Sequence, residues 1–209
     1  MNGILGLFGL KSKPEQRDDR QDSMMFTTAF AGQGVDGALL VPWEARAVEV
    51  GADRFNASKG TKLLQALWAK DKYMSQLDSD AIARMERFFQ FATVAANRDI
   101  ICQDEYGNFM VVLLNGRIAI DRLQPWGEKL RLAEAVPGEI LGEMSLLDSG
   151  MRFSVCTTLS ICEIAILDAE AMDDMLTADP TLAANLIALL ARKLSLRLRT
   201  VSARLTDKN

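Results

Sequence analysis

Residues 137–154 read PGEILGEMSLLDSGMRFS, and this stretch decides how the rest of the chain is interpreted. Gly138 and Gly142 flank a short apolar run, and Glu143 and Arg152 then place a carboxylate and a guanidinium nine positions apart. Glycine lets a backbone approach a bound group closely, where a β-carbon would obstruct it. We interpret the stretch as a turn-rich binding site that offers one cation and one hydrogen-bond acceptor to a ligand.

The composition indicates a folded protein and excludes most familiar hydrolytic chemistries. Of the 209 residues, 49% are apolar, which suffices for one sizeable core with extensions. The net charge of −4 argues against general attraction to nucleic acid, although residues 192–204 are locally basic. No histidine is present, so the commonest general base and zinc ligand are missing. The three cysteines are odd in number and lack metal-like spacing, so we interpret them as reduced thiols.

Three segments are expected along the chain. Residues 1–22 are predicted to be a flexible tail, because the second half of this segment is almost all charged or polar. The apolar run at 4–10 is too short to span a bilayer or to form a typical signal, so we expect a cytoplasmic protein without a membrane span. Residues 23–76 are predicted to be a partly helical N-terminal extension, most of which the pattern does not assign, and residues 77–209 the main domain.

Helical patterns precede the main run of strands. One helix is predicted from Thr61, and a second from Leu77, with an N-cap at Asp78 or Ser79. The apolar positions of the second helix recur at spacings of three and four, as in core-facing helices. They are Ile82, Met85, Phe88, Phe89 and Ala92.

After Asn97 the chain shows short apolar runs broken by glycine and asparagine, which predict the strands of a sandwich or barrel. The runs are 99–102, 109–114, 117–120, 130–135, 154–158 and 162–167. Asn115-Gly116 lies between two of them and predicts a two-residue hairpin, since both residue types tolerate positive φ. Gly107-Asn108 predicts another turn.

The C-terminal part is again helical. A short helix is predicted over 169–176, followed by a long one that begins with Asp179 as N-cap and Pro180 as first residue and runs to about Arg204. An apolar stripe on the long helix consists of Leu182, Leu186, Leu190, Leu194, Leu198, Val201 and Leu205. Its broader first half is predicted to pack on the barrel. Its narrower second half favours a homodimer through the same helix of another copy, with packing inside one chain as the alternative.

This order of elements resembles the cyclic-nucleotide-binding domain of bacterial catabolite activators and protein-kinase regulatory subunits. The resemblance covers about 77–205. It implies an α+β fold, with an antiparallel β jelly-roll barrel flanked by N-terminal helices and a long C-terminal helix. Its most specific part is the phosphate-binding cassette, which reads Gly-Glu, two small or apolar residues, Leu, and an Arg near the eleventh position. These places are filled by Gly142, Glu143, Met144, Ser145, Leu146 and Arg152, with turn glycines at Gly107, Gly116 and Gly138.

The cassette residues have distinct expected roles. Arg152 is expected to donate a charge-assisted bond to an exocyclic phosphate oxygen, worth roughly 1.5–3 kcal/mol. The amide N–H groups of Met144 and Ser145, in a short helical turn, point at the same phosphate. Glu143 would repel a phosphate, so its expected partner is the ribose 2′-hydroxyl. The alternative is that Glu143 and Arg152 form an ordinary surface ion pair, worth about 0–1 kcal/mol.

Two residues depart from the family pattern. Met151 replaces the proline often found before the arginine, and Phe153 stands where relatives carry Ala, Ser or Thr. A Thr there aids binding of cyclic GMP, so Phe153 favours cyclic AMP, although its ring could also restrict the site. Ser154 is a further candidate ligand-binding residue. Relatives cap the base from the long helix, where Arg197, Thr200 and Ser202 are the open candidates, each with solvated surface as its alternative.

We therefore expect a non-enzymatic cyclic nucleotide sensor, with cyclic AMP as its regulatory ligand, no other cofactor and an effector protein that the sequence does not identify. Direct DNA binding is not expected, because only Thr206–Asn209 follow the long helix, where the bacterial activators continue into a helix-turn-helix. The alternative is a degenerate module that keeps the barrel for structural or protein-interaction purposes without ligand. A cupin-like metal enzyme is a weak third possibility, since the expected histidines are absent.

Overall fold

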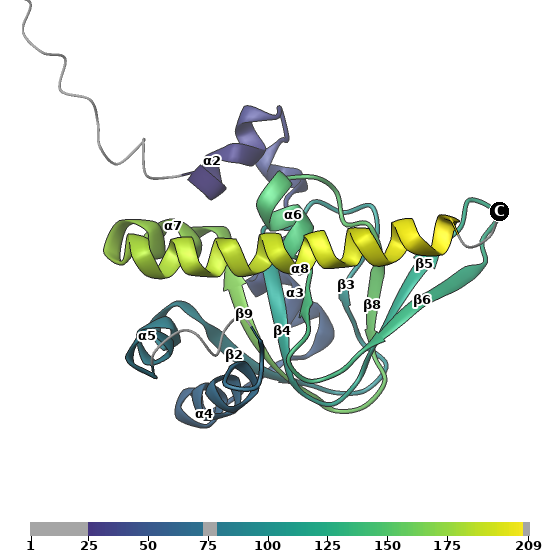
Figure 1. The fold of residues 1–209 in the computed structure, drawn as a ribbon. Coiled ribbons are helices and arrows are strands. Elements are labelled where there is room, and N and C mark those ends of the chain that lie inside the picture. Colours follow the sequence, from purple (N-terminus) through teal and green to yellow (C-terminus); the bar gives the residue numbers. More distant parts are fainter. Residues whose placement is uncertain (1–24, 73–78, 207–209) are drawn as a thin grey trace, which may run out of the picture.

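Two antiparallel sheets form the barrel, and helices lie around it (Figure 1). The computed structural model describes residues 25–72 and 79–206. The five-stranded sheet has the order β1-β2-β9-β4-β7, and the four-stranded sheet has the order β3-β8-β5-β6. The strands are β1 (Asp53–Arg54), β2 (Gln90–Val94), β3 (Asp99–Ile101), β4 (Phe109–Asn115), β5 (Ile118–Leu123), β6 (Lys129–Ala135), β7 (Ile140–Leu141), β8 (Val155–Thr158) and β9 (Cys162–Asp168). The helices are α2 (Met25–Gly32), α3 (Trp43–Val50), α4 (Ala57–Trp68), α5 (Ser79–Met85), α6 (Glu143–Asp148), α7 (Ala169–Ala178) and α8 (Pro180–Thr206). The predicted α+β jelly-roll barrel with a long C-terminal helix is confirmed, and each of the six predicted apolar runs contains a strand.

Strand β4 is buried on both faces, and it separates two hydrophobic clusters. Side chains alternate between the two faces of a strand, so one set packs toward the helices and the other toward the second sheet. The helix-facing set meets α4, α5, α7 and α8, and the other set meets β5 and β8. The two sets are Met110, Val112 and Leu114, and Phe109, Val111 and Leu113. This double burial explains why the strand reads as an uninterrupted apolar run.

The predicted hairpin at Asn115-Gly116 is wrong. Strand β4 pairs with β7 and β9, whereas β5 pairs with β6 and β8, so these two residues carry the chain from one sheet to the other. Gly116 has a φ of +100°, but Asn115 is not among the residues of positive φ, as a type I′ hairpin would require. A β-carbon on Gly116 would lie 2.6 Å from the carbonyl oxygen of Ile161, so glycine is needed here for close packing between connections.

The second predicted helix is shorter than its apolar spacing indicates. Helix α5 ends at Met85, a 3-10 turn follows over Glu86–Phe88, and Ala92 lies in β2 opposite Ile164 of β9. Short apolar spacings fit helices and strands alike, and sheet pairing decides the outcome here. Leu77 and Asp78, at the predicted start of this helix, lie outside the described residues. The helix predicted from Thr61 begins earlier, at Ala57, because the side chain of Asn56 caps it.

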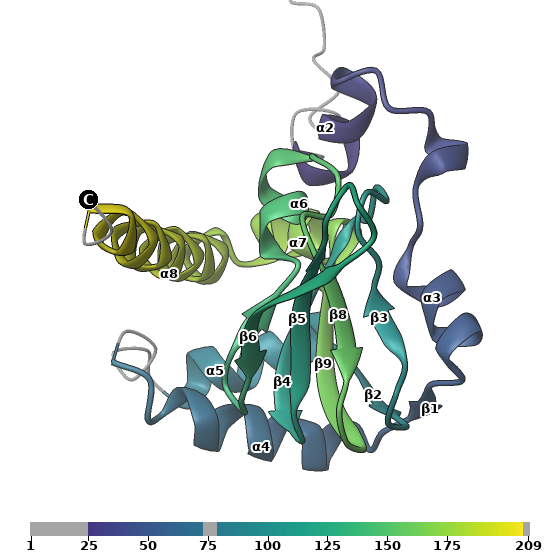
Figure 2. The same ribbon diagram turned by 90° about the vertical axis from the view of Figure 1, so that its right-hand side faces the viewer.

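Helix α8 has a buried first half and an exposed second half. It begins at Pro180 as predicted, and the carboxylate of Asp179 accepts a hydrogen bond of 3.1 Å from the backbone N–H of Leu182. The residues buried against the barrel side are Leu182, Ala183, Leu186, Leu189 and Leu190. Leu198 and Val201, farther along, are exposed. In Figure 2 α8 is seen almost end-on, to one side of the barrel strands.

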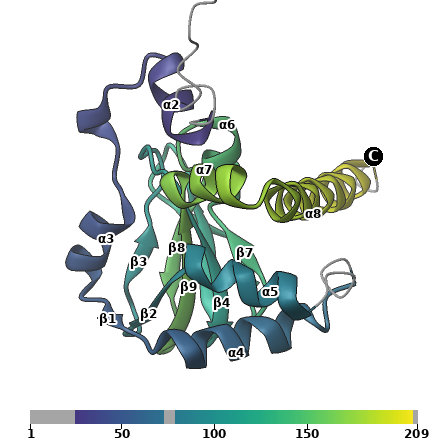
Figure 3. The ribbon, with the colours of Figure 1, turned by 90° about the vertical axis from the view of Figure 1, so that its left-hand side faces the viewer.

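Residues 25–54 wrap around the side of the barrel opposite α8 (Figures 2 and 3). The backbone N–H groups of Phe26 and Thr27, at the start of α2, donate to the buried carboxylate of Asp173 on α7 at 2.8 and 2.9 Å. Farther along, the indole of Trp43 in α3 packs edge to face on the ring of Phe109 in β4. The segment therefore contacts both α7 and the barrel, and β1 at its end pairs with β2. The predicted flexible tail at 1–22 lies outside the described residues.

Candidate functional site

A cavity of about 560 Å³ opens between the barrel, helix α6 and the second half of α8. This volume lies within the range of ordinary ligand pockets, about 300–1,000 Å³. Strands β5, β6 and β7 supply mainly apolar wall residues, and α8 contributes Leu196, Arg197, Thr200 and Val201. All seven residues predicted from the sequence line this one cavity. They are Gly142, Glu143, Met144, Ser145, Arg152, Phe153 and Ser154.

Gly142 precedes α6 in the left-handed conformation, with a φ of +76°. A β-carbon at this position would lie 2.5 Å from Nη1 of Arg152 and 2.9 Å from Cδ1 of Ile101. An L-residue would thus be strained by its backbone and would collide with the guanidinium. The sequence indicated that this glycine makes room for a ligand, and the structure shows that it makes room for Arg152.

Arg152 is a buried cation at the wall of the cavity. Its side chain is held by two backbone carbonyls, with Nη1 donating to Gly142 at 2.7 Å and Nη2 donating to Phe109 at 2.7 Å. The guanidinium also lies over the ring of Phe109, 4.6 Å from its centroid. Burial lowers the pKa of Arg152 to about 10, which still leaves it protonated at neutral pH. Among the described residues no carboxylate forms an ion pair with it, although it is only 3% exposed.

Glu143 is also 3% exposed, and its partner is Arg197 of α8 rather than Arg152. One guanidinium nitrogen of Arg197 donates to Oε1 of Glu143, and the other donates to the carbonyl of Ile140 at 2.8 Å. Burial raises the pKa of Glu143, and the positive charge of Arg197 is the main influence that opposes the rise. A surface ion pair between Glu143 and Arg152 is therefore wrong, because both groups are buried and each has other partners.

Two of the three candidate residues for a cap on the base lie at the cavity. Arg197 and Thr200 of α8 line the cavity, but Ser202 does not. Phe153 is 55% exposed, and the guanidinium of Arg122 lies 4.6 Å from the centroid of its ring. The ring therefore sits at the rim, beside β5, and leaves the cavity open. Ser145 is buried in α6, whereas Met144 is exposed.

Replacing Arg197 by methionine is expected to make the stability of the protein more sensitive to pH. Without the cation, the pKa of the buried Glu143 rises further above the ordinary value of 4.5. A carboxyl whose pKa is raised by folding holds its proton more tightly in the folded state, so the free energy of unfolding falls as the pH rises from 4.5 through the raised pKa. Urea unfolding at pH 5 and pH 8 should show a larger loss for Arg197→Met at pH 8. Arg199→Met, on an exposed position of the same helix, is the control. Equal losses for Arg197→Met at both pH values would contradict this reasoning.

A jelly-roll barrel with a buried arginine beside a short glycine-led helix has the chemistry to hold a small anionic molecule. The family comparison agrees: residues 92–179 match the model of the cyclic nucleotide-binding domain. The matched segment runs from β2 to the end of α7.

Individual relatives point the same way. The chain is 33% identical over 107 residues to the cyclic AMP receptor protein of Thermus thermophilus, which covers 51% of this chain and 50% of that protein. It spans about half the length of the curated relatives that it matches. A cyclic nucleotide-binding domain from Methylobacillus flagellatus superposes with a TM-score of 0.69 at 19% identity, over 76% of this chain and 89% of the other. The regulatory domain of Toxoplasma gondii PKA, crystallised with cyclic AMP, superposes with a TM-score of 0.51 at 18% identity, over 57% and 46% of the two chains.

Two features are absent from residues 25–72 and 79–206. No helix in these ranges is long and apolar enough to cross a membrane. In the same ranges no three side chains of the types that commonly ligate metals come together as a metal site would require.

Proposed function

We propose that the protein is a non-enzymatic regulator that binds a cyclic nucleotide in the cavity below α8. The observation that carries this proposal is the buried guanidinium of Arg152, which lines the cavity without a carboxylate partner among the described residues. A buried charge is costly unless it is paired, so this position favours an anionic ligand. A single phosphate charge in a largely apolar cavity matches that requirement.

Glu143 is proposed to accept a hydrogen bond from the ribose 2′-hydroxyl. Its carboxylate lines the same cavity as Arg152, but in this structure it is paired with Arg197. A ligand hydroxyl would therefore compete with Arg197 for the same oxygen atoms. Loss of the pair would release the second half of α8, which has few other buried contacts. Binding and helix position are coupled only as far as the ligand prefers one arrangement over the other.

Cyclic AMP is the proposed ligand in preference to cyclic GMP. Phe153 has no hydroxyl group for a guanine, and its exposed ring at the rim offers an apolar face for a base. The names of the Thermus relative and of the Toxoplasma complex both refer to cyclic AMP. The discrimination would come from side chains at the rim, since both nucleotides share the same ribose and phosphate.

Cyclic AMP should raise the thermal and chemical stability of the full chain. A ligand that binds only the folded state at a hundred times its dissociation constant adds about 2.7 kcal/mol to the free energy of unfolding. Calorimetric titration and urea unfolding with and without nucleotide measure this, with cyclic GMP and 5′-AMP as comparisons. A weaker effect of cyclic GMP would support the preference for adenine. If neither cyclic nucleotide changes stability, the degenerate module, which keeps the barrel for protein contacts, is favoured instead.

The second half of α8 is proposed to pair with α8 of a second copy. Leu198 is exposed there, as is Val201, which also lines the cavity, and an exposed apolar stripe on a helix favours association. Sedimentation equilibrium should detect a dimer at micromolar concentration, and Leu198→Glu should dissociate it by placing like charges at the seam. Val48→Glu, at an exposed position of α3, is the control. A monomer in the unmutated protein would contradict this proposal. If the protein is a monomer, the effector protein would instead contact α8 itself and respond to its position.

A further inference from the structure

A second buried arginine lies behind Arg152. Arg46 of α3 is 2% exposed, and its guanidinium forms ion pairs with Glu49, at 2.5 Å, and with Glu105. Arg46, Glu105, Phe109 and Arg152 all line one small internal gap that has no room for a water molecule. The two guanidinium groups are thus buried beside the same gap as Glu105, whose side chain is 37% exposed.

Helix α3 contacts two residues that in turn contact Arg152, namely Glu105 and Phe109. The backbone carbonyl of Glu105 accepts a hydrogen bond of 2.7 Å from the backbone N–H of Arg152. The ring of Phe109, over which the Arg152 guanidinium lies, packs edge to face against Trp43 of α3 with centroids 5.5 Å apart. The loop that contains Glu105 is further fixed by Val41, whose N–H donates to the carbonyl of Tyr106 at 2.8 Å. The N-terminal segment therefore lies directly behind the cation of the ligand site.

The carboxylate of Glu105 is a potential competitor for Arg152. The charge of Glu105 raises the pKa of Arg152 and that of Arg46 lowers it, so both groups lie within electrostatic range of it. Yet Glu105 pairs with Arg46, and within residues 25–72 and 79–206 the side chain of Arg152 donates only to backbone carbonyls. If Glu105 paired with Arg152 instead, it would neutralise the cation that an anionic ligand requires.

We propose that Arg46 is a positioning residue that holds Glu105 in an ion pair and so keeps the guanidinium of Arg152 available to the ligand phosphate. This inference rests on the proposed function. Arg46 touches no ligand itself, because it lines the gap behind Arg152 rather than the large cavity. Its removal leaves the Glu105 carboxylate without its cation and beside Arg152, where it competes with the phosphate. The segment 25–54 thereby acquires a part in ligand binding.

The test is a four-variant cycle on the full chain, with cyclic AMP affinity measured by calorimetry. Arg46→Met is expected to weaken binding about tenfold when Glu105 is present, and less than threefold in a chain that already carries Glu105→Gln. A merely structural role of Arg46 would not be relieved by removing the Glu105 charge. Arg117→Met is the control. It removes an arginine that pairs with Glu134 of β6, and it should leave the affinity unchanged. Thermal melting of each variant confirms that it is folded.

The possible outcomes are distinct. Equal losses from Arg46→Met with Glu105 and with Gln at that position would overturn the inference, as would an unchanged affinity in Arg46→Met. Absence of cyclic nucleotide binding in the unmutated chain would overturn the proposed function and this inference together. If Arg46→Met is too unstable to study, Arg46→Lys replaces it, because an ammonium cannot make the same forked contacts with Glu49 and Glu105. It should show a smaller loss that the Glu105→Gln change again relieves.

Discussion

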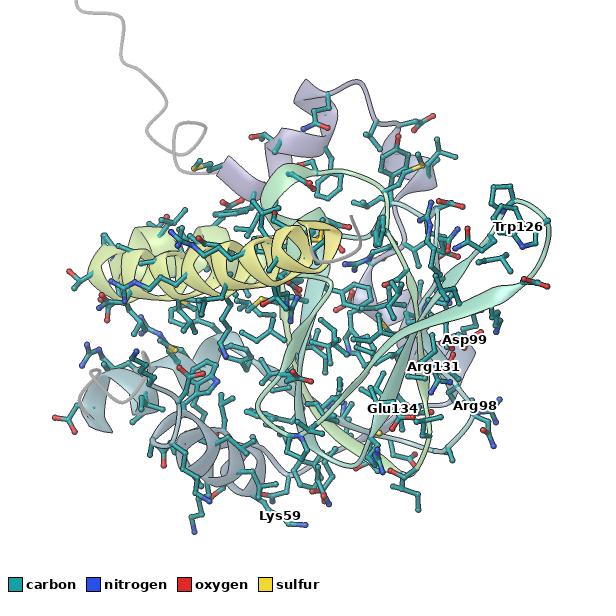
Figure 4. All side chains as sticks on the ribbon, turned by 45° about the vertical axis from the view of Figure 1, so that its right-hand side comes forward. Lys59, Arg98, Asp99, Trp126, Arg131 and Glu134 are labelled. Carbon is teal, nitrogen blue, oxygen red and sulfur yellow. The ribbon has the colours of Figure 1, made fainter. Side chains whose placement is uncertain are left out.

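Replacing Arg152 by alanine is expected to weaken cyclic AMP binding by at least about 100-fold, which corresponds to roughly 2.7 kcal/mol. The change removes the charge-assisted bond to the phosphate, and it also removes the only buried guanidinium among the described residues that lines the large cavity. Calorimetric titration measures the loss. Arg98→Ala is the matched control, because Arg98 is exposed on a loop far from α8 (Figure 4).

The same variant is expected to be less stable as well as weaker in binding. The guanidinium satisfies the carbonyls of Gly142 and Phe109, and its removal leaves both without this donor. A buried acceptor without its donor costs about 1–3 kcal/mol. Arg152→Lys separates the two effects, since it keeps the charge and can still reach a carbonyl. Its expected loss of affinity is intermediate, and binding by Arg152→Ala within fivefold of the unmutated protein would show that Arg152 does not hold the phosphate.

Replacing Gly142 by alanine is expected to reduce both stability and affinity. The left-handed conformation at this position costs an L-residue about 1–2 kcal/mol. The added β-carbon would also lie 2.5 Å from Nη1 of Arg152 and 3.2 Å from the carbonyl oxygen of Phe109, so the guanidinium must move. We expect the free energy of unfolding to fall by about 2 kcal/mol, and the affinity for cyclic AMP to fall 10- to 30-fold.

A matched control is present in the hairpin between β5 and β6. Gly127 also has positive φ, at +91°, but no atom lies within 4 Å of the position of its missing β-carbon. Gly127→Ala therefore carries the backbone strain alone and should not affect ligand binding. The tip of this hairpin, marked by Trp126, projects into solvent (Figure 4). If Gly142→Ala and Gly127→Ala have the same effect on affinity, displacement of Arg152 is not the cause.

The cassette could be predicted from the sequence because its residues are close in the chain. Gly142, Glu143 and the helical turn after them form one local unit, and the arginine follows within ten positions. The chemistry of each side chain was therefore readable without knowing the fold. The residues that pair with these side chains could not be predicted. Glu143 meets Arg197 across 54 positions, and Arg46 meets Glu105 across 59, and no pattern in the sequence brings such residues together.

The sequence-based predictions of the fold were wrong or incomplete for the same reason, which is that contacts between distant residues decide the outcome. The Asn115-Gly116 dipeptide favours a hairpin locally, but β4 and β5 belong to different sheets, and strand pairing decides the course of the chain. The segment 25–54 lacks strong periodicity because its helices have only eight residues each and rest on specific contacts, such as that of α2 with Asp173. Contacts of that kind can be recognised only after the barrel has been assembled.

The division of α8 into an anchored half and a free half makes the helix a lever. From Leu190, the last deeply buried residue, to Thr206 there are 16 positions, or about 24 Å at 1.5 Å per residue. A tilt of about 10° at the anchored half would move the far end by about 4 Å, because a helix transmits rotation along its length. Arg197 lies seven positions beyond Leu190, and its ion pair with Glu143 holds the second half of the helix in place. A small change at a buried carboxylate would thus become a displacement large enough for another protein to detect.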